Sequence, residues 1–157
     1  ALDAVASHAH VKICLMHMEG MPQNMQANPQ YTDIVTEVKN FLQQRIQIAE
    51  AWGISTDRLV IDPGFGFGKT LQHNLTLLNR LDKFTELDVP VLAGLSRKSM
   101  LGAITGNTVH QSLHESVAAA LLAVIKGARI VRVHDVKASK DALAVYHAMI
   151  QQNHVSQ

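Results

Sequence analysis

Asp62-Pro63-Gly64-Phe65-Gly66-Phe67-Gly68-Lys69-Thr70 is the stretch that decides the fold, because it joins a strand to a glycine-rich turn. The aliphatic residues from Leu59 to Ile61 predict a strand, and Pro63 lacks the N–H that a strand ladder needs, so the strand ends at Asp62. Its carboxylate therefore stands at the carboxyl end of a strand, where open α/β sheets and barrels place their functional residues. The stretch predicts an active-site loop.

Two phosphate-binding motifs are excluded by their spacing. Gly68-Lys69-Thr70 ends like a Walker loop, but Pro63 stands where that motif requires its first glycine. A dinucleotide-binding fingerprint starting at Gly64 requires a third glycine at position 69, which is a lysine. A glycine-spaced loop with Phe65 and Phe67 suits a flat ring substrate better than a triphosphate. A flexible strand-to-helix turn remains the alternative.

Length and composition indicate one globular unit that acts on a small molecule. The chain has 157 residues, 47% of them hydrophobic, which is enough for one core and too few for two ordinary domains. The 14 basic and 13 acidic residues give a net charge of +1, so no footprint for nucleic acid or a membrane surface is present. With one cysteine, no signal peptide and no apolar run of membrane length, a cytoplasmic location is expected.

Apolar periodicity predicts four strands that alternate with helices. The expected strands are residues 11–18, 59–62, 89–95 and 129–134, and the expected helices are residues 31–52, 74–81, 117–125 and 142–150. The first strand reads as buried on both faces, and Ser112 to Glu115 has capping-box spacing before the third helix. This order implies an α/β fold whose parallel strands are joined by right-handed crossovers.

Polar residues follow each predicted strand: His17, Asp62, the segment Ser96 to Ser99, and the pair Arg132 and His134. In a TIM barrel the functional residues come from the carboxyl ends of several strands, and eight βα units take about 250 residues. Four units in 157 residues therefore predict half of a (β/α)8 barrel.

Two of these clusters offer cationic groups. The segment Ser96-Arg97-Lys98-Ser99 precedes a predicted helix start, so its N–H groups and two cations suit an anionic group, the alternative being a solvated basic turn. Alternation along the last strand places Arg132 and His134 on one side, the alternative being an edge-strand charge pattern. The remaining histidines lack ligand spacing, so no metal site is expected within this chain.

Four motifs in a fixed order carry a family resemblance. Leu15-Met16-His17-Met18, the loop from Asp62 to Lys69, Gly94 to Ser99, and Ile130 to Asp135 resemble the bacterial dihydropteroate synthases, which are pterin-binding enzymes. That family is a (β/α)8 barrel that joins 6-hydroxymethyl-7,8-dihydropterin diphosphate to p-aminobenzoate and releases pyrophosphate. The resemblance implies that residues 1–157 are the carboxyl-terminal half of the pterin-binding barrel and that the amino-terminal half is absent.

The resemblance also implies the pterin site and the catalytic residues. Asp62 would hold the amino-pyrimidine edge, because a carboxylate accepts two donors at once. Lys98 would bind the carbonyl side of the pterin, Arg132 would stack on its face, and Met16 would line the pocket. Of these, Asp62, Lys98 and Arg132 are the expected catalytic residues.

The second substrate and the leaving group have their own expected residues. Gly66, Phe67 and Lys98 would shape the p-aminobenzoate site, and Ser99 at a helix start would receive its carboxylate. Arg132 and His134 would hold the diphosphate. Mg²⁺ would assist pyrophosphate release with a ligand from the absent half, so this chain would supply no metal ligand of its own.

The implied enzyme is a cytoplasmic homodimer of folate biosynthesis and a sulfonamide target, and the isolated 157-residue chain is expected to be inactive. Loss of pyrophosphate would give a delocalised pterin cation that the amine attacks, so no protein nucleophile is required. Two alternatives stay open. One is a binding domain of the pterin-dependent methyltransferase type, which shares the glycine loop, and the other is a non-catalytic half-barrel.

Overall fold

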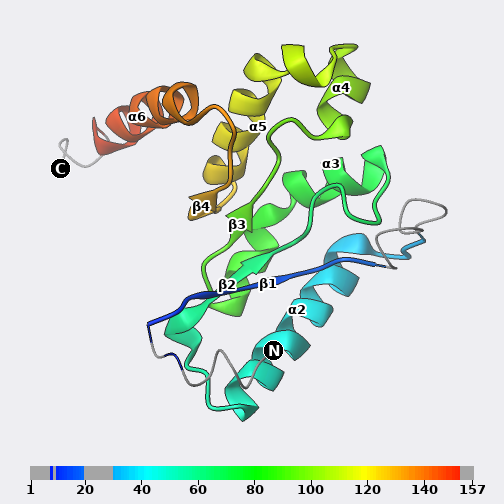
Figure 1. Cartoon of the computed structure of the whole chain (residues 1–157), viewed down its shortest axis with the longest axis vertical. Helices are drawn as coiled ribbons and strands as arrows, with labels where there is room; N and C mark the ends of the chain where they lie inside the picture. Colours follow the sequence, from blue (N-terminus) through cyan, green and yellow to red (C-terminus); the bar gives the residue numbers. More distant parts are fainter. Residues whose placement is uncertain (1–7, 9, 20–29, 153–157) are drawn as a thin grey trace.

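The computed structural model describes residue 8 and residues 10–19 and 30–152, in which strands and helices alternate (Figure 1). The strands are β1 (Ile13–Met16), β2 (Leu59–Asp62), β3 (Leu92–Ala93) and β4 (Ile130–Val131). The helices are α2 (Ile34–Ala51), α3 (Leu71–Asn79), α4 (Ser99–Thr105), α5 (Leu113–Ile125) and α6 (Val136–Gln152). Three 3₁₀ helices join them, namely η1 (Thr56–Arg58), η2 (Leu81–Leu87) and η3 (Val109–Gln111). The predicted order of elements is confirmed.

The four strands run parallel in chain order. β1 pairs with β2, β3 pairs with β4, and a parallel bridge between Ile61 and Val91 links the two pairs. Figure 1 shows α6 at one end of this series, beyond β4, and α2 at the other, beside β1 and β2. The prediction of parallel strands joined by helical crossovers is therefore confirmed.

One side of the strands packs on the helices and the other does not. The core residues on the helical side are at most 9% exposed; they are Leu15, Ile61, Val91 and Ala93. We call the opposite side the open face; register and alternation place Cys14, Met16, Val60, Asp62, Leu92 and Ile130 on it. Ile130 is 39% exposed and Cys14 is exposed as well. The expectation that the first strand is buried on both faces is wrong, because only its helical side is covered.

Local sequence signals account for the long helix α2. Asp33 caps it by accepting from the N–H groups of Val35 (3.1 Å) and Thr36 (3.3 Å), and its buried residues recur at three- and four-residue steps. Its end is marked by Gly53, which adopts a positive φ of 77°.

The strands at the other end of the sheet are shorter than predicted. β3 and β4 form two ladder positions each, and Arg132 makes the last ladder bond through its N–H to the Ala93 carbonyl (3.0 Å). Beyond it, the His134 N–H donates to Ser96 Oγ (3.2 Å) and not to a strand. The prediction that Arg132 and His134 lie on one strand is therefore wrong, because the chain leaves the ladder at Arg132.

Helix starts also differ from the sequence expectation. Thr70 caps α3 at Leu71, three residues before the predicted start, through a reciprocal pair of bonds with His73. The capping box predicted at Ser112 is wrong, because its hydroxyl donates to the Val109 carbonyl (2.7 Å) and caps nothing. No helix within the described part of the chain is long and apolar enough to cross a membrane.

Gly64 provides a test of how tightly the loop packs on β1. Its φ is 73°, and a Cβ built there would lie 1.8 Å from the His17 carbonyl oxygen. Gly53 has a similar φ of 77° but open space around it. Gly64→Ala is expected to lower the free energy of unfolding by about 2 kcal/mol or more, and Gly53→Ala by about 1 kcal/mol, because only the first adds a clash to the backbone strain. Urea unfolding measures both, and equal losses would show that the close approach is unimportant.

Candidate active site

Three predicted site residues lie together on the open face at the carboxyl ends of the strands. Met16 ends β1, Asp62 ends β2 in register beside it, and Arg132 follows β4. Met16 and Asp62 share a side because they are partners in the strand register, and Arg132 reaches that side through its ion pair with Asp62. The sequence predicted that residues at the carboxyl ends of the strands meet at one rim, and the ion pair of Asp62 and Arg132 joins two of those ends.

Asp62 is the centre of this group. It is 1% exposed, and both of its carboxylate oxygens are bonded. Oδ1 accepts from the Gly64 N–H (2.8 Å), and Oδ2 accepts from Arg132 Nη2 (3.1 Å). The Asp62 carbonyl also accepts from the His17 N–H (3.0 Å), which extends the pairing of the two strands by one residue. Backbone bonds thus fix the carboxylate from within, while Arg132 is its partner toward solvent.

Arg132 reaches Asp62 across Gly94. The arginine side chain is 54% exposed, yet its guanidinium lies so close to Gly94 that an added Cβ would stand 2.6 Å from Nη2. Gly94 follows β3, between the strands that carry the two ion-paired residues. The absence of a side chain at position 94 therefore makes the ion pair possible.

Phe67 and Lys98 form the second contact of the site. Lys98 Nζ lies 4.2 Å from the centroid of the Phe67 ring, a cation–π geometry, and its stem passes over Gly66, where a Cβ would meet Lys98 Cδ at 3.3 Å. Burial, and secondly the charge of Arg132, lower the pKa of Lys98, while Asp62 opposes the shift. Gly66, Phe67 and Lys98 are thus brought together as predicted.

Phe65 differs from Phe67. It is 1% exposed and belongs to the hydrophobic core, so it cannot present a ring to a ligand. The expectation of two aromatic side chains in the loop is therefore half right. A sequence shows that both are phenylalanines, but the turn between them decides which one faces inward.

The segment from Ser96 to Ser99 does not direct two cations to one point. Arg97 has a left-handed backbone (φ 56°), and its guanidinium pairs with Asp135 (3.0 Å), while Lys98 lies over Phe67. Ser96 is buried and bonds to His134 through both the N–H and Nδ1 of that residue (3.2 and 3.0 Å). Ser99 is exposed and is the first residue of α4, which confirms the predicted helix start.

Sequence reasoning missed the role of Lys69. Its side chain is 4% exposed and makes three contacts inside the glycine loop and with His17. The hydrophobic run before the loop and the apolar positions after it gave no sign that this lysine points inward. A lysine closing a three-glycine turn was the only available signal.

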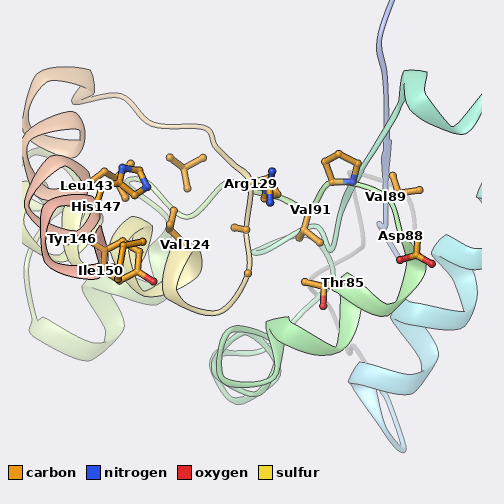
Figure 2. Close-up of a pocket in the computed structure, with 14 residues that line it drawn as sticks. Thr85, Asp88, Val89, Val91, Val124, Arg129, Leu143, Tyr146, His147 and Ile150 are labelled. Carbon is orange, nitrogen blue, oxygen red and sulfur yellow. The ribbon is translucent and has the colours of Figure 1, made fainter. Parts of the chain in front are cut away.

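Two further observations concern metals and cavities. In the described residues no three His, Cys, Asp or Glu side chains converge as a metal site. A hollow of about 800 Å³ lies away from the site, at the amino ends of β3 and β4, with Leu143, Tyr146 and His147 of α6 on one wall and Thr85 and Val89 on the other (Figure 2). None of the predicted site residues lines it, so the chemistry of the strand ends and not this hollow marks the site.

Comparison with known proteins identifies the family of the chain. The family described as pterin binding enzyme matches residues 1–134. A dihydropteroate synthase of Neisseria meningitidis serogroup C is 52% identical over 151 residues, which are 95% of this chain and 53% of that protein. The chain spans about half the length of the curated relatives it matches.

Solved structures of dihydropteroate synthases superpose closely on this chain. A Yersinia pestis dihydropteroate synthase in a sulfonamide drug complex superposes with a TM-score of 0.93 at 42% identity, covering 96% of this chain and 55% of that one. The enzyme from Xanthomonas albilineans in complex with 7,8-dihydropteroate gives 0.86 at 51% identity, covering 94% and 53%. On the strength of the family match and of strand ends that carry the expected side chains, the chain belongs to the family of pterin-binding enzymes.

Proposed function

We propose that this chain is the carboxyl-terminal half of a dihydropteroate synthase and supplies the last four βα units of its (β/α)8 barrel. Four parallel strands with one open face support the barrel, because closing it would cover Cys14 and Ile130 on that face. The relatives and solved structures that carry this name support the activity. The enzyme joins a dihydropterin diphosphate to p-aminobenzoate for folate biosynthesis.

The observation that carries this proposal is the buried carboxylate of Asp62. Its Oδ1 is held by a backbone N–H, and its Oδ2 bonds to an exposed guanidinium. Arg132 thereby occupies the position that N–H donors of a pterin's amino-pyrimidine edge would take. A planar guanidinium displaced from the carboxylate is suited to stack on the ring that replaces it. Met16, beside Asp62 on the open face, lines the same site.

The p-aminobenzoate site is proposed around Phe67 and Lys98. Their cation–π contact over Gly66 gives a flat wall next to a charge, which suits an aromatic amine. Ser99, at the exposed start of α4, is the proposed partner of the benzoate carboxylate. His134 and Arg132 are the proposed partners of the diphosphate.

The reaction breaks the bond between the pterin methylene carbon and the diphosphate oxygen and forms a bond from that carbon to the amine nitrogen, which then loses a proton. Arg132 and His134 stabilise the charge that develops on the leaving oxygen, and Asp62 and Lys98 hold the ring in place. By the family resemblance Mg²⁺ would assist the release of pyrophosphate, with its protein ligand in the half of the barrel outside this chain. From the family resemblance we also propose a homodimer located in the cytoplasm.

Asp62→Asn tests the pterin assignment in the full-length synthase that contains this chain. An amide keeps one acceptor and turns a donor toward the donors of the ligand, so pterin affinity is expected to fall by about 1.5 to 3 kcal/mol or more. Isothermal titration calorimetry measures the change. Asp88→Asn is the matched control, because that carboxylate is exposed at the end of η2 and asparagine tolerates its left-handed backbone. Unchanged affinity in Asp62→Asn would refute the role of the carboxylate.

Arg132 and His134 are expected to divide their tasks. Arg132→Ala should weaken both pterin and pyrophosphate by about tenfold or more, because the displaced guanidinium is proposed to stack on the pterin ring and to bring its charge to the diphosphate. His134→Ala should weaken pyrophosphate alone, since its contacts are with Ser96. Titration of each ligand separately measures both effects, and an equal loss of pterin affinity in the two variants would contradict the division.

Ser99→Ala is expected to separate the two substrates. Because Ser99 starts α4 and does not touch Asp62 or Arg132 in this structure, the variant should change sulfonamide inhibition severalfold and leave pterin affinity within about twofold. Inhibition constants and pterin titration provide the two readings. If both ligands weaken to the same extent, Ser99 supports the helix start and not the second substrate.

A further inference from the structure

Lys69 is a buried cation that the proposed reaction does not use. Its ammonium donates to the carbonyl oxygens of Gly64 (2.9 Å) and Phe67 (2.8 Å) and lies 3.0 Å from His17 Nδ1. An ammonium has three N–H donors, and these contacts account for all three. With 4% of the residue exposed, Lys69 has neither a free donor nor surface to offer a ligand.

The three contacts link the two ends of the turn to the neighbouring strand. Gly64 and Phe67 are also joined directly, because the Phe67 N–H donates to the Gly64 carbonyl (3.1 Å). His17 follows β1, and its ring packs edge-on against Phe41 of α2 at 4.9 Å between centroids. The ammonium therefore lies inside the turn and ties it to β1 and, through the His17 ring, to α2.

Each end of the turn holds one part of the proposed substrate site. The N–H of Gly64 donates to Asp62 Oδ1, and the ring of Phe67 lies under Lys98 Nζ. The Lys69 contacts are thus to the same two loop residues that set the carboxylate and the aromatic wall. If the ammonium were removed, one buried and one partly buried carbonyl group would lose a charged donor, and the turn would lose its link to His17.

We infer that Lys69 is a positioning residue, which acts through His17 and the carbonyls of Gly64 and Phe67 to hold the loop in the form that presents Asp62 and Phe67 to the two substrates. This inference rests on the proposed function, since it names how that site is held. Lys69 itself touches neither substrate. His17 is the second member of the arrangement, because its Nδ1 must accept from the ammonium.

The pKa shifts of His17 and Lys69 are consistent with a bond from the Lys69 ammonium to His17 Nδ1. Burial, and secondly the charge of Lys69, lower the pKa of His17 to about 4, so near neutral pH the ring is uncharged and Nδ1 is able to accept. Burial also lowers the pKa of Lys69 to about 8, with Asp62 and Glu19 opposing the shift. The lysine is therefore mostly charged at pH 7 and loses its proton over a range in which ordinary lysines keep theirs.

The pH dependence separates positioning from simple structural support. Between about pH 8 and 10.5 the unfolded chain binds this proton and the folded chain does not, so the contribution of Lys69 to the unfolding free energy rises with pH across that range. Over the same range its bonds to the loop cease to be charge-assisted and weaken. If Lys69 only supported the fold, its loss of a proton above pH 8 would leave ligand affinity unchanged. If Lys69 positions the loop, the same loss of a proton lowers ligand affinity. Among the described residues, the other titratable or charged groups around the loop are His17, Glu19, Tyr31, Asp62, His73, Lys98 and Arg132.

The test uses the full-length synthase that contains this chain, with a pterin and a sulfonamide as separate probes. Lys69→Met removes the ammonium but keeps an unbranched side chain, and each affinity is expected to fall about tenfold at pH 7. Lys69→Arg keeps the charge at every pH used, so it should recover much of the affinity and remove the fall above pH 8. Lys137→Met is the control, because that lysine pairs with Asp141 on the exposed side of α6.

The second arm follows the affinity of the unsubstituted protein with pH and compares it with that of Lys69→Arg. At each pH the affinity of the unsubstituted protein is divided by that of Lys69→Arg, so titration of the probe itself cancels. For both probes this ratio is expected to fall with a midpoint near pH 8. A flat ratio, or unchanged affinities in Lys69→Met, would overturn the inference. If the unsubstituted protein bound neither probe at pH 7, the proposed function would fail instead, so the two failures are distinguishable.

Discussion

The site depends on a close approach between two backbone segments, the glycine loop after β2 and the end of β1. The Gly64 Cα lies so near the His17 carbonyl that only a hydrogen fits between them. That proximity extends the pairing of β1 and β2 to His17 and Asp62. It also leaves the Gly64 N–H beside the Asp62 carboxylate and its carbonyl beside the Lys69 ammonium.

Charge is distributed very unevenly over the molecule. The whole chain carries +1, but Lys69, Lys98 and Arg132 all lie near one carboxylate, that of Asp62. The local excess of positive charge suits the proposed substrates, which bring a diphosphate and a carboxylate. Overall composition gave no sign of it, because residues far from the site balance the total.

Sequence patterns predicted what depends on local periodicity. The bounds of β2 follow from an aliphatic run that a proline ends, and the helix start expected at Ser99 is the start of α4. What they missed depends on contacts between distant segments. Arg97 turns to Asp135 and Ser96 binds His134, both across 38 positions, and the inward direction of Lys69 rests on His17, 52 positions earlier. Such pairings have no local signature, so the two cations next to each other at 97 and 98 seemed to serve one anion.

Under the proposed function, the Arg132 side chain competes with the pterin for the Asp62 carboxylate. A ligand reaches the carboxylate only by exchanging with the guanidinium, so its apparent affinity is reduced by the fraction of molecules in which the pair is closed. A ligand that offers two donors and no ring gains the carboxylate but gives the displaced arginine nothing to stack on. A flat heterocycle bonds to the carboxylate through the donors on its edge and gives the displaced guanidinium a ring face to stack on. The ion pair therefore favours ligands with a fused aromatic ring over free guanidinium or urea groups, which have the donors but no ring face.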